Sequence, residues 1–306
     1  MANPLLADHT GVRQPIPPAQ HVLDGAYRLT TAAHNIGTGV APQLHGGAWE
    51  LRSGDSIHLL RELADASVDA VVTDPPYSSG GMVRADRMVQ PSIKYQQSEH
   101  RRGAYPEFHG DNRDQRGFLA WSSLWLADAW RVTRPNGVLV LFVDWRMLPT
   151  ITDAVQAGGW IWRGIVPWHK PAARPQLGRF TQSCEFAVWG SKGPLPFKRG
   201  VPVLPGLVTS VPVPASKRDH ITEKPLSVMR ELVRIARPGG LVLDPFAGSG
   251  TTGAAALLEG RSFLGFELSA EYLEIARARL RDIASDASPA GAEKRGTVAR
   301  GGALQN

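Results

Sequence analysis

The residues with the clearest chemical potential stand at the end of a short apolar run. Residues 68–72 predict a buried strand, and Asp74-Pro75-Pro76-Tyr77 follows at its tip. Asp74 supplies a carboxylate acceptor, the prolines leave nearby carbonyls free to accept, and Tyr77 offers a flat ring with a polar end. This combination suits a planar molecule that carries an amine. The alternative is a proline-rich turn in which Asp74 only caps a helix.

A second stretch combines a strand with a glycine-rich turn and the start of a helix. The strand is expected at 241–245, the turn at 246–250, and the helix runs to about Leu258. Glycines allow a ligand to approach the backbone, and a helix N-terminus supplies donors. No lysine follows Gly250, so a nucleoside triphosphate site is not expected, whereas residues 248–253 satisfy the short G-x-G-x-x-G pattern of dinucleotide sites.

Two acidic residues distinguish between the ligands that such a turn can bind. Asp244 stands at the strand tip, where a carboxylate suits a cationic ammonium better than a pyrophosphate. Glu267 ends the next expected strand, where it can accept from both hydroxyls of a ribose. A ligand with an ammonium, a ribose and no phosphate is S-adenosylmethionine, which is therefore the predicted cofactor.

The positive charge of the chain is concentrated in one segment. The 306 residues carry a formal net charge of +6, and residues 163–219 hold nine basic and two acidic side chains, a net charge of +7. This concentration favours a polyanionic partner, although a solvated basic face would give the same composition. The candidate contact residues are Arg174, Arg179, Lys198, Arg199, Lys217 and Arg218.

The single cysteine, Cys184, leaves no disulfide framework and no cysteine-based metal site within one chain, and we predict no metal. The N-terminus shows no signal-peptide pattern, and no run approaches eighteen apolar residues. A soluble protein of the reducing cytoplasm is the expectation.

Alternating strands and helices predict an α/β domain with a parallel sheet. An antiparallel hairpin is expected from residues 160–168 and 185–189. The other strands are expected at 49–53, 68–73, 138–143, 241–245 and 262–267, and the helices at 56–63, 118–133, 147–157, 223–236, 251–258 and 269–283.

The regular pattern extends over residues 48–283. Residues 1–47 are expected to form a loosely ordered arm and residues 284–306 a disordered tail. Within the domain, residues 78–117 form a long loop with arginines between aromatic residues, and residues 191–219 form a short basic insertion rich in proline and glycine.

Taken together, these motifs resemble those of the amino-group DNA methyltransferases, which act on adenine N6 or cytosine N4, in the permuted order that puts Asp-Pro-Pro-Tyr before the cofactor motif. The chain departs from the family pattern at Ile221, where proline is usual, and at Ser78, where asparagine is frequent. Residues 191–219 stand in the usual place of the family's target-recognition region, which is short here. The resemblance is carried by Gly54-Asp55, residues 74–77, Trp168-His169-Lys170-Pro171 with Glu185, residues 220–225 and residues 244–252.

The resemblance implies a Rossmann-like, circularly permuted methyltransferase fold whose mostly parallel sheet has seven strands and an antiparallel edge hairpin. It implies S-adenosylmethionine as cofactor and double-stranded DNA as substrate, and it leaves open a homodimer and a cognate restriction enzyme. The implied cofactor-binding residues are Asp55, Lys224, Asp244, Pro245, Phe246, Gly248, Ser249, Gly250, Thr251, Thr252 and Glu267.

Individual roles also follow from the resemblance. Phe246 and the 248–250 turn would cradle the methionine part, Glu267 would hold the ribose, Asp55 would lie near the adenine ring and Lys224 near the methionine carboxylate. The catalytic group would be Asp74, Pro75, Pro76 and Tyr77.

The target base must leave the stack to reach such a site. An aspartate at position 74, where serine also occurs in the family, favours site-specific methylation of adenine N6. Methylation of cytosine N4 and a non-catalytic nucleic-acid-binding relative are the alternatives. Cys184, which follows Ser183 at an expected strand start, is interpreted as structural and not as the nucleophile of a cytosine-C5 enzyme.

Overall fold

The computed structural model describes residues 39–42, 44, 48–77, 113–173, 175, 177–213 and 223–286. Most of the predicted arm 1–47, of the predicted loop 78–117 and of the predicted tail 284–306 lies outside these residues, so the division into arm, domain and tail stays a prediction. No helix among the described residues is long and apolar enough to cross a membrane.

The described residues form an α/β structure around one eight-stranded sheet with the order β1-β8-β7-β2-β3-β5-β4-β6. Neighbours from β1 to β3 pair in parallel, β5 pairs antiparallel with both β3 and β4, and β6 is parallel to β4. The strands are β1 Trp49–Ser53, β2 Val68–Thr73, β3 Thr133–Val143, β4 Ile161–His169, β5 Cys184–Ser191, β6 Val208–Thr209, β7 Leu241–Asp244 and β8 Ser262–Glu267.

The expected α/β class with a mostly parallel sheet is confirmed, the circular permutation stays a prediction, and the strand count of seven is wrong. The eighth strand, β6, has two residues and pairs beside Trp168 and His169 of β4. The indole Nε1 of Trp168 donates to the carbonyl of Ser210 at 3.1 Å and fastens the segment there. Two residues in a proline-rich segment give no periodic signal, so sequence patterns miss such a strand.

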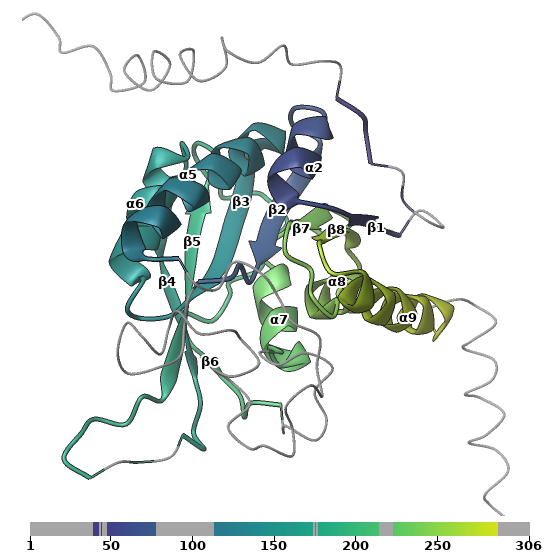
Figure 1. Ribbon diagram of the computed structural model, residues 1–306. Coiled ribbons are helices and arrows are strands. Elements are labelled where there is room, and N and C mark those ends of the chain that lie inside the picture. Colours follow the sequence, from purple (N-terminus) through teal and green to yellow (C-terminus); the bar gives the residue numbers. More distant parts are fainter. Residues whose placement is uncertain are drawn as a thin grey trace, which may run out of the picture. The chain divides into compact units, whose positions relative to one another are not determined.

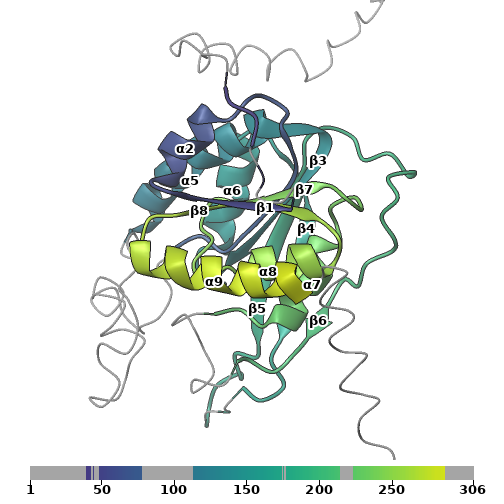
Figure 2. The ribbon, with the colours of Figure 1, turned by 90° about the vertical axis from the view of Figure 1, so that its right-hand side faces the viewer.

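The helices cover both faces of the sheet (Figures 1 and 2). On one face lie α2 (Ser56–Glu62), α5 (Gln115–Val132) and α6 (Leu148–Ala157). The other face carries α7 (Leu226–Val233), α8 (Thr251–Leu258) and α9 (Ala270–Asp286). The central strands are therefore buried on both sides, and every residue of β2 is buried.

Local chemistry explains where helix ends differ from expectation. Helix α5 begins three residues early because the Asp114 carboxylate caps it, accepting from the Gly117 N–H at 2.7 Å. Helix α7 begins three residues late because Pro225 occupies its N-cap. Strand β3 begins at Thr133, five residues before the expected start at 138, although Asn136 within it has a turn-like φ of 64°.

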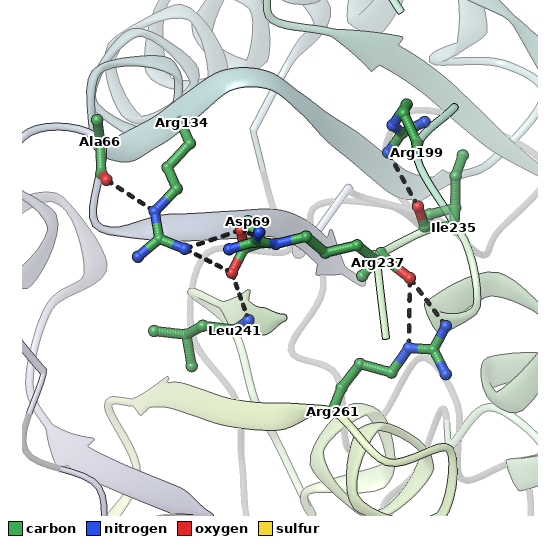
Figure 3. Close-up of polar contacts among 9 residues, drawn as sticks. Ala66, Asp69, Arg134, Arg199, Ile235, Arg237, Leu241 and Arg261 are labelled. Atoms are coloured by element: carbon green, nitrogen blue, oxygen red, sulfur yellow. Dashed lines mark hydrogen bonds and ion pairs between the residues drawn. The ribbon is translucent and has the colours of Figure 1, made fainter. Parts of the chain in front are cut away.

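One buried carboxylate organises the amino ends of the central strands (Figure 3). Asp69 of β2 accepts from Arg134 Nη1 at 2.9 Å with both oxygens, and from Arg237 Nε at 2.8 Å. It also accepts from the backbone N–H of Leu241, the first residue of β7, at 2.7 Å. Asp69 thus ties together the starts of β2, β3 and β7, and this explains a charged residue within an otherwise apolar strand.

Strand register fixes which loops reach which edge of the sheet. Val143, at the carboxyl end of β3, pairs with Phe186, so the loop 170–183 between β4 and β5 emerges at the edge where the parallel strands end. Ser191 pairs with Val138, near the start of β3, so the following segment begins at the opposite, amino edge. Figure 1 shows the 170–183 loop extending away from the sheet.

Candidate active site

A cavity of about 200 Å³ opens at the carboxyl edge of the sheet. The tips of β1, β2, β7 and β8 converge on it, as expected for ligand sites of open α/β sheets. It is lined by all four predicted catalytic residues and by every predicted cofactor-binding residue except Gly250. These sequence-predicted residues, which lie far apart in the chain, are thus brought to one place.

Asp244, at the tip of β7, is 1% exposed. Its Oδ1 accepts from Thr73 Oγ1 at 2.6 Å and from the backbone N–H of Phe246 at 3.0 Å. Burial raises the pKa of Asp244 to about 6, although bonds from Thr252, Thr73 and Phe246 act in the opposite direction. A cationic group in the cavity would favour the charged form of this carboxylate.

Glu267, at the tip of β8, holds the glycine-rich turn in place. Its Oε2 accepts from the Gly248 N–H and its Oε1 from the Ser269 N–H, both at 2.8 Å. Burial raises the pKa of Glu267 above its ordinary value, against these backbone hydrogen bonds. Each carboxylate oxygen has a second lone pair, so the residue can still accept from a ligand hydroxyl.

Close packing against neighbouring elements explains why two positions near the turn are glycines. Gly250 has φ +81°, and a Cβ there would lie 3.0 Å from the Cβ of Ala276 in α9. At Gly253 a Cβ would approach the Phe263 ring to 2.6 Å. The G-x-G-x-x-G match therefore reflects, at its last two glycines, the close packing of α8 against α9 and β8. This agrees with the absence of Gly250 from the cavity wall.

Asp55 serves first as a helix cap. Its Oδ1 accepts from the backbone N–H groups of Ile57 at 2.9 Å and His58 at 3.4 Å, at the start of α2. The residue is exposed and lines the cavity beside Gly54. Its predicted place near the adenine ring is compatible with this position and stays a prediction.

Lys224 contacts the catalytic motif directly. Its Nζ donates to Asp74 Oδ2 at 2.6 Å and to the Tyr77 hydroxyl at 3.3 Å. The lysine is 6% exposed, and the Asp74 side chain is 23% exposed. Burial alone would lower the pKa of Lys224, but Asp74 and Glu185 outweigh it and raise that pKa, so the side chain is an ammonium. The predicted role at a methionine carboxylate is not tested by this contact.

Several residues in the cavity wall or directly behind it were not predicted as site residues from the sequence. Trp121 of α5 packs against Phe246 with ring centroids 5.4 Å apart, and the Arg113 guanidinium lies 4.1 Å from the Trp121 ring centroid. Arg279 of α9 donates to Thr251 Oγ1 at 2.7 Å and to Glu223 Oε1 at 2.8 Å. The expected helix at 118–133 contains three tryptophans, and the sequence does not indicate which of them lines the cavity.

The charges around the cavity define the class of ligand. Five carboxylates and two basic side chains line it: Asp55, Asp74, Glu223, Asp244, Glu267, Arg113 and Lys224. A polyphosphate would meet net negative charge, whereas a cationic nucleoside would meet complementary charge and aromatic surface. The donor and acceptor set therefore fits S-adenosylmethionine and does not fit a nucleoside triphosphate or a dinucleotide.

The three basic candidates that the structure describes, Arg179, Lys198 and Arg199, do not gather at one place. Arg179 lies exposed on the 170–183 loop, at the edge that carries the cavity. Arg199 donates to the carbonyl of Ile235 at 3.1 Å, beyond the end of α7 and near the Asp69 cluster (Figure 3). Lys198 is exposed next to Arg199. Arg174, Lys217 and Arg218 lie outside the described residues.

Comparison with known proteins agrees with the site. The sequence model of the DNA methylase family, named for N6 and N4 methylation, matches residues 68–203 and 207–278. Type II methyltransferase M2.MboI of Moraxella bovis is 25% identical over 253 residues, covering 77% of this chain and 88% of that protein. Type II methyltransferase M.HinfI of Haemophilus influenzae is 27% identical over 256 residues, covering 75% and 67%.

Among solved structures, the complex of M1.HpyAVI with S-adenosylmethionine aligns with a TM-score of 0.54 and 26% identity over 76% of this chain and 98% of that one. The family match extends over more than half of the chain, so this protein belongs to the DNA methylase family of amino-group DNA methyltransferases. The predicted family is confirmed, as is S-adenosylmethionine as the cofactor at the level of the family.

Proposed function

We propose that this protein is a site-specific DNA methyltransferase that methylates the exocyclic N6 of a flipped adenine. The observation that supports this most strongly is the single cavity shared by Asp74, Tyr77, Asp244 and Glu267. The cavity presents both acceptors with a ring for a planar amine and carboxylates for a cationic nucleoside. Double-stranded DNA is the proposed partner.

S-adenosylmethionine, when bound, supplies an electrophilic methyl group on a sulfonium. Glu267 would accept from the ribose hydroxyls, Asp244 would face the ammonium, and Phe246 with Trp121 would provide apolar surface. The two acidic groups also keep phosphate-bearing nucleotides out of the cavity.

Asp74 and the Pro75 carbonyl would accept hydrogen bonds from the target amine. These bonds orient the nitrogen lone pair towards the methyl group, and Tyr77 would stack on the base. In methyl transfer the N–C bond would form as the S–C bond breaks, with the bonding pair leaving on the sulfur as a neutral thioether. The Asp74 carboxylate would stabilise the positive charge on the amine and accept the N–H proton. Catalysis then depends on positioning and electrostatics, with no covalent intermediate on the protein.

Cytosine N4 is the second candidate target, because the family includes enzymes for both amino groups. Asp74, where serine also occurs in this family, favours adenine. A non-catalytic nucleic-acid-binding relative is disfavoured, since the complete catalytic motif faces the cavity. The homodimer and the cognate restriction enzyme stay predictions. Sedimentation analysis of the protein in solution would test the first, and inspection of neighbouring genes would test the second.

For the DNA surface we favour the 170–183 loop. Its charged residues are all basic, and Leu177 and Phe180 are fully exposed on it beside Arg179. Lys217 and Arg218 are kept as candidates because the described residues on either side, Thr209 and Lys224, lie at the cavity edge. Arg199 is less suited, since its guanidinium is engaged near the amino edge.

Replacing Asp74 by alanine tests the division of roles. We expect Asp74→Ala to lower methyl transfer to unmethylated DNA by at least about 100-fold, because the amine loses a charged acceptor. Cofactor affinity should stay within a few-fold. Transfer of labelled methyl groups and calorimetric cofactor titration measure the two effects, with Asp153→Ala on the exposed face of α6 as a matched control. Loss of cofactor binding together with transfer would contradict the assignment.

A further inference from the structure

Glu185 is a carboxylate that is linked to the catalytic residue Asp74 through the ammonium of Lys224. It lies in β5, and its Oε2 is 3.5 Å from Lys224 Nζ, whose other carboxylate partner is Asp74 Oδ2 at 2.6 Å. The second oxygen of Glu185, Oε1, accepts from Lys170 Nζ at 3.0 Å. Lys170, Glu185, Lys224 and Asp74 therefore form a continuous row of alternating charges that leads from the base of the 170–183 loop to the catalytic motif.

The ammonium of Lys224 has two competing effects on Asp74. It fixes the carboxylate and keeps it ionised, but it also occupies an oxygen that must accept from the target amine, and it neutralises the negative charge of that carboxylate. With Lys224 and Asp74 alone the local charge would be zero. Glu185 places a second carboxylate beside the Lys224 ammonium, and Lys170, on the far oxygen of Glu185, brings the whole row back to zero. Glu185 therefore acts by competing with Asp74 for the Lys224 ammonium, and not by adding net charge.

The surroundings of Glu185 support an ionised carboxylate. Burial would raise its pKa, but Lys224 and Lys170 lower it, and the net pKa lies below the ordinary glutamate value. The Lys224 ammonium also lies 5.0 Å from the centroid of the Phe142 ring, within the range of a cation–π contact. Lys224 is thus shared between groups on three elements and is not the exclusive partner of Asp74.

We propose that Glu185 is a positioning residue for methyl transfer: by sharing the Lys224 ammonium with Asp74 it weakens the hold of that ammonium on the Asp74 carboxylate, which can then accept from the target amine. The proposal rests on the proposed function, since it assigns to Asp74 the acceptor role given above. It adds a residue of the antiparallel strand β5 to the residues that act on the target amine.

The isosteric variant Glu185→Gln tests this role. In single-turnover assays with saturating cofactor and DNA, it should slow transfer by roughly 10- to 100-fold, the effect of losing one hydrogen bond to a charged group. The dissociation constants for cofactor and DNA should stay within about threefold of wild type. Glu185→Asp, which keeps the charge, should recover part of the lost rate.

A double-mutant cycle separates positioning from a general loss of structure. If Glu185 acts through Lys224, then Glu185→Gln should change the rate by less than about threefold in a Lys224→Met background. Thermal unfolding of each variant checks that it is folded. Glu231→Gln, on α7 and ion-paired with Arg234 at 2.9 Å, is the matched control and should transfer at the wild-type rate.

The outcomes are distinct. If the wild-type protein does not methylate DNA, the proposed function fails before Glu185 is tested. If the wild type is active, then an unchanged rate in Glu185→Gln overturns the positioning role. The same conclusion follows if the rate losses of Glu185→Gln and Lys224→Met multiply independently, or if Glu185→Gln weakens cofactor binding in proportion to the rate.

Discussion

Asp244 is held in surroundings that oppose its charge. It is almost fully buried, and its pKa of about 6 lies well above the ordinary aspartate value of 3.8. Thr73, Thr252 and the Phe246 N–H bind the carboxylate without offsetting the loss of solvent. A cationic ligand would offset it, so this residue couples the stability of the domain to occupation of the cavity.

The raised pKa has a definite consequence for stability. Between pH 3.8 and 6 the folded protein binds more protons at Asp244 than the unfolded chain does, so this residue lowers stability as the pH rises through that window. The free energy of unfolding of Asp244→Asn, relative to wild type, should therefore increase by up to about 3 kcal/mol from pH 3.8 to above pH 6. Urea unfolding across this range measures the difference. A difference that does not vary with pH would contradict the assigned pKa.

Single residues show both what the sequence reveals and what it does not. Asp74 and Glu267 could be predicted because strand tips in a parallel sheet meet at one edge. The contact between Lys224 and Asp74 could not, since it joins positions 150 residues apart and depends on side-chain geometry. Glu185 could be recognised as part of a family motif, but its role could not be predicted because it depends on the contact with Lys224.

At the scale of elements, Asp69 holds together strands that lie far apart in the sequence. Its carboxylate joins β2 to the start of β3 through Arg134 and to the start of β7 through Arg237 and the Leu241 N–H. The strands themselves were predicted from apolar runs, but a partner 168 residues away is not visible in a run. This cluster lies at the amino edge, away from the cavity.

Asp69 therefore offers a test that separates structure from catalysis. We expect Asp69→Asn to lower the free energy of unfolding by about 1–3 kcal/mol, because charge-assisted hydrogen bonds are weakened. Methyl transfer per folded molecule should be unchanged. Chemical denaturation and the assay at a temperature where the variant is folded measure the two effects. A large loss of transfer in the folded variant would show that the two edges are not independent.

At the scale of the whole molecule, the sequence shows which segment carries the excess positive charge, but it does not show on which surface that charge lies. Residues 163–219 read as one basic segment. The register divides it, because β5 runs from the cavity edge at Cys184 to the amino edge at Ser191. The loop before β5 thus reaches one edge and the segment after it begins at the other, and sequence patterns do not give register.

This division predicts unequal effects on DNA binding. Arg174→Ala with Arg179→Ala should reduce the slope of log affinity against log salt by about 2, since each phosphate contact contributes close to one unit. Lys198→Ala with Arg199→Ala removes the same charge from the other edge and should leave the slope nearly unchanged. Fluorescence titration of duplex DNA at several salt concentrations gives both slopes. Equal slopes for the two pairs would contradict the proposed surface.

The identity of the methylated base tests the central claim most directly. Unmethylated duplex DNA is incubated with the wild-type protein and labelled S-adenosylmethionine, then digested to nucleosides and analysed by mass spectrometry, with Asp74→Ala in parallel. We predict labelled N6-methyladenine from the wild type and none from the variant. Labelled N4-methylcytosine would contradict the adenine assignment, and no labelled nucleoside from a protein that binds cofactor and DNA would contradict the enzyme.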